Sequence, residues 1–248
     1  MLRKVLFNIY FWPMFVLVTI IGVLVVSSGM AIYSLTGKKN EAVLLRRSIK
    51  VYGQILIRWI PFFGPVTLVE NENLKAVPAK AIFVTNHCSA VDPYCFAVVP
   101  GDFSFLTSWP FKIPVYKWFM KKAQYLDSRQ GWSEVQRQGT ELLNRGCSLL
   151  IWPEGHRSRD GNIGKFQNGA FRLACETGYP VVPIFISGSG KLLPPGQRFL
   201  TPSRVRLKIL KTCHPSHPST SKKDVTILRD QVREMLLAEQ KAEETENG

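Results

Sequence analysis

Cysteines and acidic residues are both scarce in this sequence, and each shortage excludes a class of protein. The five cysteines are odd in number and scattered, with no Cys-x-x-Cys pair. This argues against a disulfide-stapled scaffold and favours reduced thiols in a chain that faces the cytosol. The 18 acidic residues are outnumbered by 32 basic ones, so the net charge is +14. This positive charge indicates an anionic partner, such as nucleic acid, a phosphorylated metabolite or an anionic membrane surface.

A continuous basic stripe is also missing. Residues 1–80 hold ten basic and three acidic side chains, whereas residues 81–160 hold nine and seven. The sequence has no zinc-finger spacing and no RNA-binding aromatic signature, so we expect no nucleic-acid partner. With 46% hydrophobic residues, the chain can still bury a sizeable core.

Charged residues are absent from the 33 positions between Lys4 and Lys38. Residues 13–33 alone, as a helix, could cross a hydrocarbon core of about 30 Å. The apolar region of a cleavable signal peptide is shorter, about 7 to 15 residues. Ser27-Ser28-Gly29 could break the helix, so a spanning and a re-entrant insertion both stay open. We expect a membrane anchor, with the rest of the protein on the cytoplasmic side, because more Lys and Arg follow the segment than precede it.

A second helix is predicted directly after this segment. Five apolar residues repeat at spacings of 4, 3, 4 and 3: Leu45, Ile49, Tyr52, Leu56 and Trp59. The opposite face carries three cations: Arg46, Lys50 and Arg58. Such a helix can lie in the headgroup layer with its cations on lipid phosphates, or pack on the domain as an ordinary amphipathic helix.

Strand and helix patterns alternate along the rest of the chain. We predict strands at residues 81–85, 103–107, 123–126, 148–152 and 181–186, and helices at 115–122, 132–145 and 166–177. The alternation predicts an α/β domain with a mostly parallel sheet flanked by helices. Residues 204–211 alternate basic with apolar side chains, as in an edge strand. We therefore divide the chain into a membrane-anchoring region (1–60), an α/β domain (61–212), and a linker, helix and frayed tail (213–248).

Polar residues at strand ends are the candidate site, because ligands of α/β sheets bind at the carboxyl ends of strands. His87 follows the first strand, and Asp92 comes five residues later at a predicted N-cap with Pro93 behind it. The two side chains meet if His87 lies in the turn and Asp92 at the helix start. A carboxylate that orients a histidine makes a general base; the alternative is a turn residue beside a helix cap.

Two further strand ends carry charged residues. Trp152 is followed by a turn that contains Glu154, Gly155, Arg157 and Ser158, and arginine binds phosphate in a bidentate manner. A solvated turn with a local Glu154–Arg157 pair is the alternative. Arg129 follows residues 125–128 and is a second candidate for an anionic group, although a surface arginine in a loop is commoner.

Together these segments resemble a known family. Asn86-His87-x4-Asp92, the Arg129 segment, Pro153-Glu154-Gly155-x-Arg157-Ser158 and Val182-Pro183-Ile184 are similar, in order and spacing, to the four blocks of the glycerolipid acyltransferases. The similarity covers about residues 45–210 and is greatest to the 1-acylglycerol-3-phosphate (lysophosphatidic acid) acyltransferases. The first and third blocks are the specific ones.

The resemblance implies transfer of a fatty acyl group from acyl-CoA or acyl-carrier protein to the hydroxyl of lysophosphatidic acid, which gives phosphatidic acid. It implies that His87 deprotonates this hydroxyl and that Asp92 orients His87. Arg129, Glu154, Gly155, Arg157 and Ser158 would serve the acceptor phosphate. The reaction would need no metal and no cofactor beyond the thioester co-substrate. The partners would be membrane lipids, the lysophospholipid and the acyl donor.

The chain departs from the family pattern in two blocks. His156 stands where the family usually has Thr, and Lys121-Lys122-Ala123 replace a region with Gly, with one extra residue before Arg129. Other acceptors therefore stay open: glycerol-3-phosphate, another lysophospholipid or a lyso-aminolipid. A non-catalytic, membrane-bound lipid-binding member of the same fold is the second alternative.

Overall fold

The computed structural model describes residues 2–37, 40–59, 65–216 and 219–247. Its strands are β1 (Val66–Leu68), β2 (Ile82–Thr85), β3 (Phe103–Thr107), β4 (Leu126–Asp127), β5 (Ser148–Ile151), β6 (Val181–Ser187) and β7 (Val205–Ile209). Its longer helices are α1 (Leu2–Ser34), α2 (Glu41–Trp59), α5 (Pro114–Lys122), α6 (Trp132–Asn144), α7 (Gly169–Thr177) and α9 (Lys222–Asn247). Short helical turns are α3 (Glu72–Lys75), α4 (Asp92–Cys95), η1 (Phe96–Val98), η2 (Pro110–Lys112), η3 (Ser128–Gln130) and α8 (Ser189–Leu192).

The described strands form one seven-stranded sheet in the order β1-β7-β6-β2-β5-β3-β4. All neighbours pair in parallel except β6 and β7, which are antiparallel. Every residue of β2 and of β5 is buried, as is typical of central parallel strands covered on both faces. The predicted α/β class with a mostly parallel sheet is confirmed.

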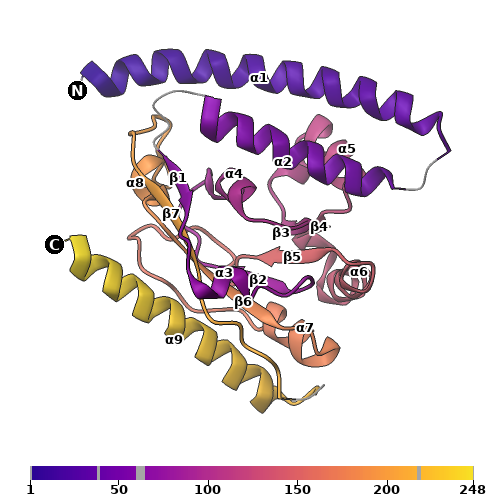
Figure 1. Ribbon diagram of the computed structural model, residues 1–248, viewed down its shortest axis with the longest axis vertical. Coiled ribbons are helices and arrows are strands. Elements are labelled where there is room, and N and C mark those ends of the chain that lie inside the picture. Colours follow the sequence, from indigo (N-terminus) through magenta and orange to yellow (C-terminus); the bar gives the residue numbers. More distant parts are fainter. Residues whose placement is uncertain (1, 38–39, 60–64, 217–218, 248) are drawn as a thin grey trace.

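Helices cover both faces of this sheet (Figure 1). One apolar core joins the sheet to α1, α2 and the α4–η1 segment. The other joins it to α6, α7 and α9. The carboxyl ends of β2, β5, β3 and β4 share one edge because these strands are mutually parallel.

Helix α1 is continuous from Leu2 to Ser34, through Pro13 and through Ser27-Ser28-Gly29. Its segment Lys4–Ser34 is long and apolar enough to cross a membrane, and only 6% of its most apolar window is buried. The remaining contacts hold α1 along the domain: Phe7 and Phe11 are buried, and Asn8 exchanges two hydrogen bonds with the backbone of Leu200. The helix therefore presents one long apolar face outward.

Helix α2 packs its apolar face on the domain. Leu45 and Leu56 are buried, and a side chain at Gly53 would place its Cβ 2.9 Å from that of Ala97, so the helix approaches closely here. Arg46, expected on the outer cationic face, is buried instead: its guanidinium makes two hydrogen bonds to the Asp102 carboxylate, at 2.7 and 2.6 Å. Lys38 and Lys39 lie outside the described residues.

Four features differ from the predictions, the first two through contacts distant in sequence. Strand β7 is not an edge strand, because β1 pairs with its outer side. Helix α9 does not fray after Gln240; it continues to Asn247, since Glu239 and Glu243 pair with Lys208 and Arg206 of β7. The strand predicted at 123–126 begins at Leu126, and the helix predicted from residue 166 begins at Gly169.

Candidate active site

The carboxyl end of β2 delivers His87 to the shared edge of the sheet. Asn86, just before it, is tied to the neighbouring strand β6 through two hydrogen bonds of 2.9 Å, one to the carbonyl and one from the N–H of Ile186. The Asn86 amide both donates and accepts a hydrogen bond, so it replaces the backbone hydrogen bonds between strands where β2 ends. The backbone before His87 is thereby fixed.

His87 and Asp92 meet as the predicted turn requires. The Nδ1 atom of His87 lies 2.7 Å from Oδ2 of Asp92. The same oxygen accepts hydrogen bonds of 2.9 Å from the backbone N–H groups of Cys88 and Ser89. The Asp92 side chain is fully buried, whereas the His87 side chain keeps 18% of its surface exposed. Asp92 thus engages Nδ1, and no described residue makes a hydrogen bond to Nε2.

Asp92 is the first residue of α4 rather than its N-cap, which is Val91. The predicted N-cap at Asp92 is therefore wrong in detail: its carboxylate bonds the turn that precedes the helix, not the N–H groups of the helix. Pro93 follows within the first turn, where its missing N–H costs nothing. The turn and the histidine are oriented by one buried charge.

Glu154 supports His87 from the next strand, β5. One carboxylate oxygen accepts the backbone N–H of His87 at 3.0 Å, and the other accepts that of Gly164 at 2.9 Å. The residue is buried, and a side chain at Gly164 would crowd the carboxylate at 3.2 Å. Both oxygens accept hydrogen bonds within the protein, and the phosphate-binding role that the resemblance implied stays a prediction.

In the rest of this turn, Gly155 and Ser158 shape the backbone, whereas the arginines are exposed. Gly155 has φ +74°, a left-handed conformation that favours glycine, and it lets the chain reverse after Glu154. Ser158 is buried; its N–H donates to the His87 carbonyl at 2.7 Å, and its hydroxyl donates to Asp160. Arg157 and Arg159 are the exposed cations of this turn, and no hydrogen bond or ion pair engages either of them among the described residues.

Arg129 follows β4, which β5 and β3 separate from β2 in the sheet. Its guanidinium makes two hydrogen bonds to Asp127, at 2.9 and 2.6 Å. These bonds hold the pKa of Asp127 below its usual range. The arginine lies at the predicted edge but is already paired.

Cys88 is not a nucleophile in this arrangement. Burial, together with the nearby Asp92 and Glu154 carboxylates, raises its pKa to about 12. The thiolate is the reactive form, and almost none is present near neutral pH.

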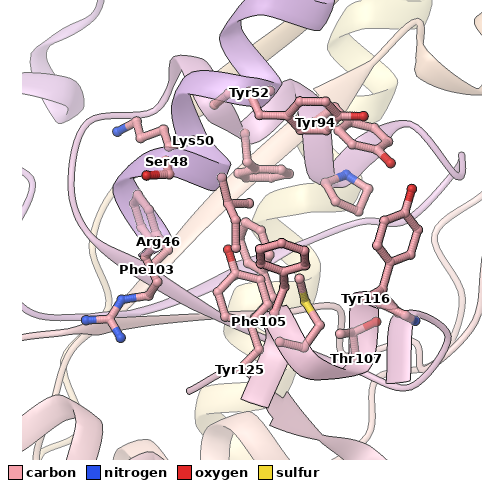
Figure 2. Close-up of a pocket in the computed structure, with 18 of the residues that line it drawn as sticks. Arg46, Ser48, Lys50, Tyr52, Tyr94, Phe103, Phe105, Thr107, Tyr116 and Tyr125 are labelled. Carbon is pink, nitrogen blue, oxygen red and sulfur yellow. The ribbon is translucent and has the colours of Figure 1, made fainter. Parts of the chain in front are cut away.

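An apolar cavity of about 230 Å³ lies beside this turn, between α1, α2 and the sheet. Trp152, at the end of β5, lines it, and its ring lies 4.9 Å from that of His87, centroid to centroid. Figure 2 shows Phe103, Phe105 and Tyr125 at the sheet side of the cavity and Tyr52 and Tyr94 at the helix side. Burial raises the pKa values of Tyr94 and Tyr125, so both phenols stay neutral.

Sequence reasoning missed Trp152 as part of the site. The available signal was its position, directly before Pro153-Glu154 at a strand end, where a large ring has to lie next to the turn. It also missed that α1 and α2 form a wall of the cavity, because helical periodicity shows that a face is apolar but not what it covers.

The sequence and the fold have known counterparts. The sequence model of the Acyltransferase family matches residues 65–187. An Arabidopsis thaliana protein named 1-acyl-sn-glycerol-3-phosphate acyltransferase LPAT1, chloroplastic, is 36% identical over 165 residues, which are 63% of this chain and 45% of that protein. A 1-acyl-sn-glycerol-3-phosphate acyltransferase of Limnanthes douglasii is 26% identical over 207 residues, covering 77% and 71%. This chain thus spans under half of the Arabidopsis relative.

Among solved structures, the 1-acyl-sn-glycerophosphate acyltransferase PlsC of Thermotoga maritima has the same fold, with a TM-score of 0.73 at 24% identity. The likeness covers 95% of this chain and 94% of that one. This chain is thus similar in sequence to the Acyltransferase family over residues 65–187 and shares the fold of PlsC.

Proposed function

We propose that the protein transfers a fatty acyl group from a thioester donor to the free hydroxyl of 1-acylglycerol-3-phosphate. The observation that carries the proposal is the His87–Asp92 pair, 2.7 Å apart at a strand end beside an apolar cavity. A base next to a space for a hydrocarbon chain fits an acyl transfer to an alcohol. The names of the relatives support the acceptor.

The chain's own residues account for the proton transfers. Nε2 of His87 takes the proton of the acceptor hydroxyl as its oxygen attacks the thioester carbonyl carbon. The tetrahedral intermediate then expels the thiolate, the C–S bond breaks, and His87 returns the proton to the sulfur. Asp92 stabilises the imidazolium between these steps through its 2.7 Å contact. An ester and a free thiol result, with no acyl-enzyme.

The two ends of the substrates require different surroundings. The cavity beside Trp152 suits an acyl chain, since most of its lining is aromatic or aliphatic. Arg157, unpaired in the described structure, suits the acceptor phosphate. The donor is acyl-CoA or acyl-carrier protein, and no metal or further cofactor enters these steps.

The membrane supplies the acceptor in this proposal. Residues 1–60 anchor the protein through the outward apolar face of α1, residues 61–212 carry the reaction on the cytoplasmic side, and residues 213–248 contain the linker and helix α9. An acceptor held in the same bilayer would reach the cavity from the α1 side.

An acceptor panel tests the proposal. Detergent-purified protein is given one acyl-CoA, and release of free CoA is measured with lysophosphatidic acid, glycerol-3-phosphate, lysophosphatidylcholine and a lyso-aminolipid. We expect transfer to lysophosphatidic acid above all others. Arg157→Ala should raise the KM for this acceptor by about 10- to 150-fold, the equivalent of one lost charged hydrogen bond. Preference for any other acceptor, or an unchanged KM, would contradict it.

A further inference from the structure

Helix α5 and the turn η2 before it expose an apolar and basic surface that the proposed reaction does not use. Val115 and Trp118 of α5 are 51% and 45% exposed, and Trp109 is 61% exposed. Large exposed apolar side chains in a cluster mark an interaction surface.

Lysines surround these apolar residues. Between residues 103 and 126 the sequence has four lysines and no acidic residue. Lys112, Lys117 and Lys121 are exposed and have no ion-pair partner among the described residues. Lys122 pairs with Glu41 at 3.2 Å. At 100° per residue, Trp118 lies near the middle of the exposed arc of α5, with Lys122 to one side and Lys117 and Lys121 to the other.

The surface is continuous with the apolar face of α1. The buried side of α5 carries Phe119, which packs in a cluster with Met30 of α1 and Leu45 of α2. A groove between the two helices is lined by Val23, Ser27 and Ala31 of α1 and by Val115 and Trp118 of α5. In Figure 1, α5 accordingly lies below the C-terminal half of α1.

We propose that η2 and α5 form a second membrane-contacting element, in which Val115 and Trp118 enter the lipid interface beside α1 and Lys112, Lys117 and Lys121 contact anionic headgroups. Tryptophan is favoured at the headgroup level, and each lysine near an anionic surface adds attraction. Trp109 and Tyr116 also line the apolar cavity. The element therefore holds the rim of the cavity at the bilayer surface, so this inference rests on the membrane placement proposed above.

Fluorescence quenching by brominated lipids tests this placement without using activity. The full chain is reconstituted in bilayers of phosphatidylcholine and phosphatidylglycerol, and the quenched fraction of tryptophan emission is compared among single variants. Removing a tryptophan that touches lipid lowers this fraction; removing one that faces water or protein raises it. Trp132 of α6, across the sheet, is the internal control.

Trp12→Phe reports on α1, and Trp118→Phe reports on α5. We expect both to lower the quenched fraction and Trp132→Phe to raise it. If Trp12→Phe lowers the fraction and Trp118→Phe raises it, the α5 element is wrong while the α1 anchor stands. If both raise it, the membrane placement itself is wrong. Circular dichroism and thermal unfolding confirm that each variant is folded.

A charge-matched pair of triple variants tests the lysines. K112Q/K117Q/K121Q removes three charges from the element, and K211Q/K222Q/K223Q removes three exposed charges near the start of α9. In anionic bilayers we expect the quenched fraction to fall in the first triple variant, because Trp118 no longer contacts lipid. In the second triple variant we expect the fraction to stay as in the wild type. Equal quenching in both triples would overturn the role of the lysines.

Discussion

Glu154→Gln tests whether this residue positions His87 or binds substrate. In the wild type both carboxylate oxygens accept backbone N–H groups, from His87 at 3.0 Å and from Gly164 at 2.9 Å. The amide offers one oxygen, so one N–H loses its acceptor and faces an NH₂ group inside the protein. Losing one hydrogen bond to a charged group costs about 1.5 to 3 kcal/mol. The unfolding temperature should fall by roughly 3 to 12 °C.

The kinetic signature separates the two roles. A displaced His87 backbone lowers kcat, whereas the acceptor KM stays within a few-fold of the wild type, because no contact with the acceptor is removed. Thermal unfolding and acceptor titration of the same preparation measure both quantities. Glu134→Gln is the control, since Glu134 is a surface partner of Arg137 and such surface pairs contribute little to stability. An unchanged unfolding temperature with a strongly raised KM would refute the positioning role.

Two further predictions concern buried groups. Asp102→Asn should lower the free energy of unfolding by about 3 kcal/mol, because it leaves the Arg46 guanidinium, only 4% exposed, without its carboxylate; a loss under about 1 kcal/mol in denaturant titration would contradict this. The pKa of Cys88 is raised to about 12, mainly by burial, so this thiol should react with iodoacetamide at pH 8 on the order of 1,000-fold more slowly than an ordinary thiol with a pKa near 8.5. The rate, followed by mass spectrometry, should rise with pH well beyond pH 9. Rapid alkylation at pH 8 would contradict this environment.

Local patterns predicted the centre of the fold well. The strand at 103–107 matches β3 at both ends, and β2, β5 and β6 lie within one residue of the predictions, because apolar runs between turn residues define central strands. The meeting of His87 and Asp92 was predictable for the same reason, since it depends on one turn and the helix start that follows it.

Contacts between distant segments were not predictable from such patterns. Arg46 is predicted as a surface cation because its partner Asp102 lies 56 residues later in the sequence. The acidic end of α9 is predicted as a frayed tail, but in the structure its glutamates form ion pairs with basic residues of β7. The second oxygen of Glu154 is occupied by Gly164 only because the intervening loop folds back over β5. In each case a charged side chain has a partner that sequence spacing does not identify.

The central claim is that His87, oriented by Asp92, is the base of an acyl transfer. The most direct measurement is phosphatidic acid formation from acyl-CoA and lysophosphatidic acid by purified wild type, His87→Ala and His214→Ala; the last removes an exposed histidine outside the site. We predict product from the wild type and from His214→Ala, and a loss of at least 100-fold for a folded His87→Ala protein. Wild-type turnover by His87→Ala would contradict the account.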